Sequence, residues 1–336
     1  MKLFPGNMLR GLLTLIRLPN LLIVALTMLL MRYAVISPLL NAMPVTMLDS
    51  PLIVTRMSFQ LGWFDFLILV ISTVLITAAG YVINDYFDIR ADLINRGSII
   101  VGNTMTRRMA MLYHNIFNIL GVIGGTYVSA RIGYFWLGIL FVLVSGLLYF
   151  YSATYKRQFL IGNIIVAFLT AMVPMMVVIY DAPPIFMHYA GSVIEFPGVA
   201  ILFYWVGGFA LFAFMTTFIR EIIKDMEDYK GDMALGRRTL PVTAGITASG
   251  IVVLFLSVVT LFLLWFIWFR YLNDKITLAY IALLVTLPMI WVNYRVLTAK
   301  DQHALHRASN VMKLIMLAGI LYSLVAGGII SSGKLF

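Results

Sequence analysis

The sequence predicts an all-α integral membrane protein with nine transmembrane helices, and three observations support this prediction. The 336-residue chain is 62% hydrophobic and only 11% charged, and its mean hydropathy is +0.98, far from the composition of a soluble globular domain. Its apolar runs reach the roughly 20 residues that a helix needs to cross the hydrocarbon core. These runs do not alternate as the strands of a membrane barrel do, so helices are the expected spanning form.

The predicted elements follow one another without a soluble domain. Residues 6–17 read as an interfacial helix, with Arg10 and Arg17 among leucines. The following apolar run has no small-residue cleavage site, so we expect a retained span rather than a signal peptide. A loop with Asp181, two prolines and a histidine is expected at 181–197. We predict a single membrane domain, 1–336, with spans at about 18–39, 64–83, 109–130, 134–151, 160–179, 198–219, 242–269, 276–297 and 311–330.

The basic residues predict how these spans are oriented. With the N-terminus in the cytoplasm, 18 of the 24 Lys and Arg residues lie on the cytoplasmic side, as the positive-inside rule requires. This explains the net charge of +10 without a nucleic acid partner. The absence of cysteine excludes disulfide frameworks and thiolate metal sites. We expect a protein embedded in a lipid bilayer, of the bacterial inner (cell) membrane type, with its N-terminus and its acidic stretches on the cytoplasmic side.

Eight of the 14 acidic residues gather in two short stretches, each at the end of an apolar run. The first stretch, Gly80–Arg96, contains Asn84, Asp85, Asp88 and Asp92. The second, Arg220–Pro241, contains Glu221, Asp225, Asp228 and Asp232 at spacings of four, three and four. Any helical part of the second stretch points these carboxylates to one face. Such a concentration of charge in so hydrophobic a protein needs a cation or a function to balance it.

The chemistry of these side chains favours Mg²⁺ that bridges a diphosphate. Hard divalent cations prefer oxygen ligands, and Mg²⁺ combines a few carboxylates with water and substrate phosphates. Zinc fits poorly, because neither stretch contains His or Cys. Basic residues beside the stretches can neutralise the remaining phosphate charge, and an apolar bundle suits a lipid tail. The implied reaction is the loss of diphosphate from a lipid, with metal ions stabilising the leaving group.

Simpler interpretations stand beside this one. Intramembrane charge also marks ion paths, so a membrane transporter is the alternative from another class of protein. The acidic residues here lie at span ends, however, and no paired broken spans are evident. For Arg157 and Arg237, anchoring at the cytoplasmic face explains the charge at least as well as phosphate contact. Three glycines, Gly121, Gly124 and Gly125, are expected to permit close helix packing.

The acidic stretches carry a resemblance to a known family. The segment Asn84-Asp85-x-x-Asp88-x-x-x-Asp92 resembles the NDxxDxxxD signature of the UbiA superfamily of intramembrane prenyltransferases. The segment Asp225-x-x-Asp228-x-x-x-Asp232, followed by GRRTLPV, is similar to the second aspartate motif of that family. Weaker matches occur in the expected order at Arg17-Leu-Pro-Asn20 and Tyr151-x-x-x-Tyr155-Lys156. The resemblance extends over nearly the whole chain.

This resemblance implies nine helices around a central, lipid-accessible cavity and a Mg²⁺-dependent prenyltransferase whose partners are a prenyl diphosphate and a lipophilic acceptor. It implies that Asn84, Asp88, Asp92, Asp225 and Asp228 hold the metal ions. Asp85 and Asp232 are then ligands, supporting groups or a base toward the acceptor. Diphosphate contacts fall to Lys156, Arg238, Arg96 and Arg17. The cavity is then lined by Asn20, Tyr151 and Asn163.

The overall character of the sequence resembles most closely the geranylgeranylglycerol-phosphate geranylgeranyltransferase-like branch of the family. The run Asn95-Arg96-Gly97-Ser98 departs from the Arg-Pro pair that follows the first motif in many relatives. Several acceptors therefore stay open, among them a prenylated glycerol phosphate and an aromatic or quinone precursor of the 4-hydroxybenzoate or dihydroxynaphthoate type. Prenyl chain length and oligomeric state do not follow from the sequence.

Overall fold

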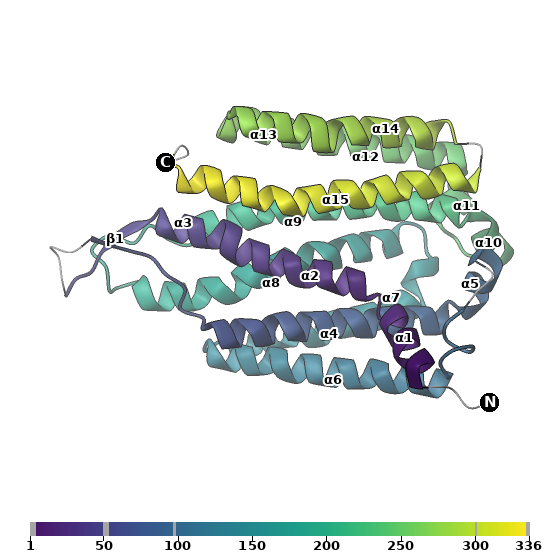
Figure 1. Ribbon diagram of the computed structural model, residues 1–336, viewed down its shortest axis with the longest axis horizontal. Coiled ribbons are helices and arrows are strands. Elements are labelled where there is room, and N and C mark those ends of the chain that lie inside the picture. Colours follow the sequence, from purple (N-terminus) through teal and green to yellow (C-terminus); the bar gives the residue numbers. More distant parts are fainter. Residues whose placement is uncertain (1–4, 50–53, 97–98, 300, 334–336) are drawn as a thin grey trace. The chain divides into compact units, whose positions relative to one another are not determined.

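The computed structural model describes residues 5–49, 54–96, 99–299 and 301–333 (Figure 1). The chain divides into two compact units. Unit 1 comprises residues 1–26, 62–165 and 228–239, and unit 2 comprises residues 27–61, 166–227 and 240–336.

Within the described residues, eight helical segments are long and apolar enough to cross a membrane: Leu18–Asn41, Trp63–Phe87, Phe135–Ala153, Ile161–Tyr189, Ala200–Glu227, Ile246–Leu272, Lys275–Leu297 and Gln302–Ser331. The one other predicted span, at about 109–130, corresponds to α6 (Arg107–Arg131), which has 25 residues but a more polar sequence. Its first turn carries two arginines, and His114 and Asn118 follow. The number of predicted spans and the number of apolar segments therefore differ only because of α6.

Unit 1 is built on three helices that pack through small residues. The helix α4 (Trp63–Phe87) lies along α6 (Figure 1) and also contacts α7 (Ile139–Ala153). A Cβ atom at Gly125 would lie 2.3 Å from the Phe141 ring, and one at Gly124 would lie 2.3 Å from the Ser72 hydroxyl. At Gly121 it would lie 3.0 Å from a backbone oxygen of α4. The prediction that these three glycines permit close packing is confirmed.

Shorter elements of unit 1 lie around the end of α4. They are α1 (Pro5–Leu15), α5 (Ile89–Arg96), the turn η3 (Tyr155–Arg157) and α10 (Tyr229–Ala234). The helix α1 contacts α4, and α5 contacts both α4 and α10. This arrangement brings together segments that are well over 100 residues apart in the sequence.

Unit 2 contains a second helical core. The helix α9 (Ala200–Glu227) packs on α15 (Gln302–Ser331) and on α12 (Ile246–Ile267), while α14 (Leu287–Leu297) covers α12 and α15 (Figure 1). A Cβ atom at Gly319 would lie 2.1 Å from the Phe212 ring, so the glycine permits the close approach of α15 to α9. Shorter helical segments of this unit are η1 (Met31–Ile36), α3 (Ser37–Asn41), α11 (Leu240–Ala244), η4 (Trp268–Leu272), α13 (Lys275–Tyr280) and η5 (Ile281–Thr286).

Two local predictions for unit 2 are wrong. The helix α8 (Ile161–Tyr189) continues through much of the segment 181–197 that was expected to be a loop. Membrane helices tolerate internal prolines, and the Asp181 carboxylate is buried against the Arg32 guanidinium at 3.2 Å rather than exposed. The fold also contains a small antiparallel pair, β1 (Pro44–Thr46) and β2 (Val54–Arg56), within a segment expected to be a loop.

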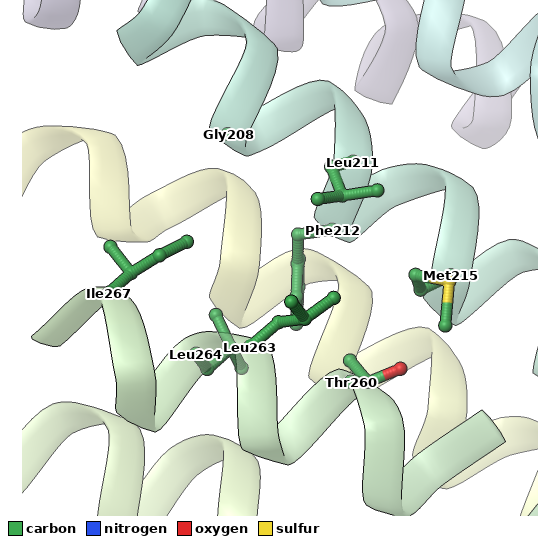
Figure 2. Close-up of a pocket in the computed structure, with 8 residues that line it drawn as sticks. All are labelled: Gly208, Leu211, Phe212, Met215, Thr260, Leu263, Leu264 and Ile267. Carbon is green, nitrogen blue, oxygen red and sulfur yellow. The ribbon is translucent and has the colours of Figure 1, made fainter. Parts of the chain in front are cut away.

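A narrow apolar groove lies between α9 and α12 in unit 2 (Figure 2). Its empty volume is about 250 Å³, which includes space open to the outside. Its one hydroxyl, on Thr260, donates a hydrogen bond of 2.7 Å to the Leu256 carbonyl, so the groove offers contact to hydrocarbon and no charge. It is lined by Gly208, Leu211, Phe212, Met215, Thr260, Leu263, Leu264 and Ile267.

Candidate functional site

The first acidic stretch forms a helix break at Asp88. The helix α4 ends at Phe87, and Asp88 has φ −91° and ψ 4° while its N–H still donates to the Asn84 carbonyl at 3.0 Å. The short helix α5 begins at the next residue, and the Asp92 N–H donates to the Asp88 carbonyl at 2.9 Å. Because Asn84 and Asp88 are four residues apart, they lie on one face at the end of α4.

The second acidic stretch repeats this local structure. The helix α9 ends at Glu227, Asp228 has φ −87° and ψ 5°, and the Asp232 N–H donates to the Asp228 carbonyl at 3.0 Å. Because of this break, the expectation of one shared helix face applies only to the carboxylates on α9, Glu221 and Asp225. Glu221 and Asp225 lie on α9 in unit 2, whereas Asp228 and Asp232 belong to unit 1.

The two short helices contact each other, and each of them buries one small residue. Ala91 of α5 is buried, as is Gly231 of α10, and each occupies the same position between the two aspartates of its own stretch. The contact between α5 and α10 places the Asp88–Asp92 segment beside the Asp228–Asp232 segment. Within unit 1, the two stretches therefore meet.

Two basic side chains form ion pairs with the carboxylate of Asp88. The Lys156 ammonium donates to one Asp88 oxygen and, at 3.0 Å, to the Asn84 side-chain oxygen. The Arg237 guanidinium donates to the other Asp88 oxygen at 2.9 Å. Asp88 is 4% exposed, so these contacts satisfy a carboxylate that has little access to water.

Arg237 also connects the two acidic stretches. Its second terminal nitrogen donates to an Asp232 oxygen at 3.2 Å, and its backbone N–H donates to the Asp232 carbonyl at 2.9 Å. The preceding Gly236 has φ +66°, a conformation that glycine adopts without strain, and it turns the chain back toward Asp232. Arg237 is 9% exposed and Asp232 is 2% exposed. The sequence explains Arg237 as an anchoring charge at least as well as a phosphate contact, whereas the structure buries it between two carboxylates.

The two carboxyl groups respond differently to this environment. Burial acts to raise the pKa of Asp88, but the charges and hydrogen bonds of Lys156 and Arg237 outweigh it and hold the pKa below its usual range. Burial raises the pKa of Asp232, and the Arg237 charge offsets this only in part. Burial also acts to lower the pKa of Arg237, but the two carboxylates outweigh it and raise the pKa. Arg237 is therefore held as a cation.

Asp85 has a partner of its own on the N-terminal segment. The Arg17 guanidinium lies 2.9 Å from an Asp85 oxygen and 4.9 Å from the centre of the Tyr81 ring. Arg17 connects α1 to the following helix with φ +53°, a left-handed conformation that costs a non-glycine residue free energy. The structure thus brings the predicted residues Arg17 and Asp85 together.

Lys156 is positioned by a close backbone approach. A Cβ atom at Gly162, in the first turn of α8, would lie 2.8 Å from Lys156 Cα and 3.0 Å from the Tyr155 carbonyl oxygen. The Arg238 N–H donates to the Arg157 carbonyl at 2.9 Å, so the segment after α10 is fastened to the same turn. The Arg238 side chain is exposed.

The other predicted site residues differ in how far they are buried. Asn20 is exposed, Tyr151 is partly buried and Asn163 is 7% exposed. Asp225 is partly buried near the end of α9, in unit 2. The side chain of Arg96 lies outside the described residues.

The donor chemistry of the site suits a hard cation, because Asn84, Asp88, Asp92, Asp228 and Asp232 offer only oxygen atoms. In the part of the chain that the structure describes, no three His, Cys, Asp or Glu side chains gather closely enough to hold a metal ion. Lys156 and Arg237 instead contact the two oxygens of Asp88. The types of side chain at the site therefore fit Mg²⁺. Two basic side chains contact the Asp88 oxygens that a metal would use.

The fold and this site define a helical integral membrane protein with paired acidic motifs at helix ends. A model of the UbiA prenyltransferase family matches residues 50–317, and the chain belongs to this family. The expected class of enzyme, a membrane prenyltransferase rather than a transporter, is confirmed at the level of the family.

Curated relatives place the chain near one group of the family. It is 36% identical over 211 residues to a protein named digeranylgeranylglyceryl phosphate synthase from Methanothermobacter thermautotrophicus, which covers 62% of this chain and 66% of that protein. It is 28% identical over 251 residues to a protein of the same name from Thermococcus kodakarensis, which covers 74% of this chain and 80% of that protein. The matched part thus spans just under two thirds of the first relative.

Solved structures share the fold. A structure of digeranylgeranylglyceryl phosphate synthase superposes with a TM-score of 0.64 at 23% identity, covering 95% of this chain and 98% of the other. A UbiA homologue from Aeropyrum pernix K1 gives 0.59 at 15% identity, covering 88% and 96%. A UbiA homologue from Archaeoglobus fulgidus, bound to DMAPP and Mg²⁺, gives 0.53 at 17% identity, covering 94% and 99%. These likenesses confirm the predicted fold class.

Proposed function

We propose that this protein catalyses the Mg²⁺-dependent transfer of a geranylgeranyl group from its diphosphate to geranylgeranylglyceryl phosphate. Membership of the UbiA prenyltransferase family supports the reaction class. The curated relatives named digeranylgeranylglyceryl phosphate synthase support the acceptor, and the Mg²⁺- and DMAPP-bound homologue supports the cofactor and the kind of donor. In the reaction, the allylic carbon–oxygen bond breaks, diphosphate leaves with the bonding electrons, and a glycerol hydroxyl bonds to the allylic carbon and loses its proton.

One observation carries the proposal: the Arg237 guanidinium contacts Asp88 at 2.9 Å and Asp232 at 3.2 Å. One carboxylate from each acidic stretch therefore contacts the same guanidinium. A diphosphate site shared by the two stretches requires such proximity. Bound Mg²⁺ would stabilise the negative charge that develops on the leaving diphosphate. The apolar helices beside the site suit the hydrocarbon of donor and acceptor.

We assign roles to the predicted residues within this proposal. The metal ligands are Asn84, Asp88, Asp92, Asp225 and Asp228. Asp85 and Asp232 support the ligands or accept the proton of the acceptor hydroxyl, and Arg17 orients Asp85 through their ion pair. Lys156, Arg238, Arg96 and Arg17 contact diphosphate. Asn20, Tyr151 and Asn163 line the substrate cavity. These roles require the whole chain to act as one membrane domain.

We also propose that the site faces the cytoplasm. The excess of basic residues on one side of the predicted spans supports this orientation. The named relatives come from archaea, so we place the protein in a cell membrane without assigning a bacterial source.

Purified protein with Mg²⁺ tests the proposal. Prenyl diphosphates of several lengths are offered with geranylgeranylglyceryl phosphate, 4-hydroxybenzoate and dihydroxynaphthoate, and the products are identified by mass spectrometry. We expect digeranylgeranylglyceryl phosphate from the geranylgeranyl donor. Prenylation of an aromatic acceptor alone would overturn the assigned acceptor, and no prenylated product from any pair would overturn the proposed activity.

A further inference from the structure

The cluster around Arg237 contains its own counter-ions. Asp88 and Asp232 are almost completely buried, and a buried carboxylate without a partner is costly. Arg237 pairs with both, and Lys156 pairs with Asp88. The chain itself therefore supplies the positive charge that these carboxylates need.

We propose that Arg237 is a positioning residue that takes the place of Mg²⁺ in the metal-free protein, holding Asp88 against Asp232 and competing with the metal for the Asp88 carboxylate. This inference rests on the proposed function, because it concerns the metal assigned there. It extends that function by naming what keeps the two acidic stretches together before the metal is bound.

The geometry favours a fixed clamp rather than an incidental contact. A guanidinium presents its N–H groups in a planar fork, so it can bind two carboxylates at once from a single position. Both Arg237 terminal nitrogens are used, one for each carboxylate. The backbone hydrogen bond from Arg237 to Asp232 and the turn at Gly236 hold the base of the side chain. The clamp is thus anchored next to one of its own partners.

Competition follows from the atoms involved. Arg237 occupies an Asp88 oxygen, and Asp88 belongs to the first acidic stretch that is proposed to bind metal. A metal ion and a guanidinium are both cations, so each weakens the binding of the other when both contact the same carboxylate. Metal binding must therefore loosen the contact between Arg237 and Asp88, and the two binding events are negatively coupled.

The experiment measures thermal unfolding of the detergent-solubilised full chain as MgCl₂ is titrated, with no prenyl diphosphate present. The six tryptophans report unfolding by intrinsic fluorescence. For Arg237→Gln, we expect a lower Tm than wild type in EDTA, a Tm close to wild type in saturating MgCl₂, and a Mg²⁺ midpoint at least about fivefold lower. A residue with a merely structural role would lower Tm equally with and without MgCl₂ and leave the midpoint unchanged.

Arg131→Gln is the matched control. Arg131 also pairs with an aspartate of unit 1, Asp65 at 3.4 Å, but its side chain is 60% exposed and its partner lies in the first turn of α4 rather than after its last. We expect it to leave the Mg²⁺ midpoint unchanged. Should Arg237→Gln fail to fold, Arg237→Lys serves instead. A lysine ammonium lacks the planar fork needed to bridge both carboxylates, so we expect a midpoint between the wild-type value and that predicted for Arg237→Gln.

The outcomes separate this inference from the proposed function. An equal Mg²⁺ midpoint in wild type and Arg237→Gln, or in wild type and Arg237→Lys where only that variant folds, would overturn the clamp. The proposed function would stand in that case if wild type still forms prenylated product only with Mg²⁺. Product formation at the full rate in EDTA would overturn the Mg²⁺ role in the proposed function, and the competition with it.

Discussion

Asp88 is the residue through which most of the site is connected. Lys156 and Arg237 both contact its carboxylate, and Arg237 extends the connection to Asp232. Asp88 also ends the long helix α4, so its position is set by a rigid element. A change at this one side chain therefore affects the proposed metal, two cations and the contact with the second acidic stretch.

Replacing Asp88 with alanine is expected to lower the rate of prenyl transfer by at least about 100-fold. The substitution removes a proposed metal ligand and leaves Lys156 and Arg237 without their shared partner. The protein should still insert, since the apolar spans are unchanged. Initial rates and membrane content are measured together, with Asp65→Asn as the control for loss of a carboxylate elsewhere on α4. An Asp88→Ala protein with more than half of the wild-type rate would contradict the assigned role.

Among the residues of the site, the sequence predicts the acidic ones better than the basic ones. The spacing of Asp88 and Asp92 identifies a motif without knowledge of the fold, because the pattern is local. The role of Arg237 depends on a turn at Gly236 and on a partner 149 residues away. Composition and position relative to a span do not distinguish an inward guanidinium from an anchoring one. The available signal is the pair Gly236-Arg237, which begins four residues after Asp232 of the second motif.

Close contact between elements sets the position of Lys156. The first turn of α8 approaches the Tyr155–Arg157 turn so closely that a Cβ at Gly162 would meet two backbone atoms at 3.0 Å or less. Backbone atoms cannot rotate away as a side chain can. The lysine that contacts Asn84 and Asp88 is therefore held by the beginning of the next membrane helix.

For Gly162→Ala we expect a fall in kcat/KM of about 100-fold, because displacement of a positioned group by about 1 Å has effects of that size. The control is Gly146→Ala in α7, where a Cβ would meet nothing within 4 Å. Steady-state kinetics of both variants are compared with wild type. Equal kcat/KM in the two variants would show that the close approach does not position Lys156.

A buried ion pair joins two elements of unit 2. The Arg32 guanidinium, on η1, lies 3.2 Å from an Asp181 oxygen on α8, and the two side chains are 2% and 0% exposed. It also lies 4.4 Å from the centre of the Phe59 ring. Breaking a buried pair by removing one partner leaves an uncompensated charge, which commonly costs about 3–5 kcal/mol.

We therefore expect Arg32→Met to destabilise the protein by about 3–5 kcal/mol, and Arg32→Met/Asp181→Leu to recover much of that loss. Reversible unfolding in mixed detergent micelles measures both variants. If the double variant were as unstable as Arg32→Met alone, the lost stability would come from packing rather than from the unpaired carboxylate.

For the whole molecule, long apolar runs made most of the membrane helices predictable. The fold class follows from them because an apolar chain in lipid must satisfy its backbone by helix formation. The end of α8 was not predictable in this way. A local reading treats Asp181 and the neighbouring prolines as signs of a loop, whereas the fold buries Asp181 against Arg32 from another part of the sequence. The β1–β2 pair likewise depends on contacts that no hydrophobic periodicity reveals.

The proposed orientation of the protein in the membrane leads to a separate prediction. The chain has no cysteine, so a single introduced cysteine can be labelled selectively. Suitable variants are Arg90→Cys and Lys230→Cys, because both positions are exposed beside the acidic stretches. We expect a membrane-impermeant maleimide to label them in inside-out vesicles and to spare them in right-side-out vesicles. The reverse pattern would place the acidic stretches on the external face.

In the proposed reaction, metal-bound carboxylates promote the departure of diphosphate from a prenyl donor. The most direct measurement is the release of diphosphate from geranylgeranyl diphosphate by purified protein with geranylgeranylglyceryl phosphate, in MgCl₂ and in EDTA. We predict release and an equal amount of digeranylgeranylglyceryl phosphate in MgCl₂, neither in EDTA, and recovery of both when MgCl₂ is restored. Equal rates of release in MgCl₂ and in EDTA would contradict a role of Mg²⁺ in the departure of diphosphate.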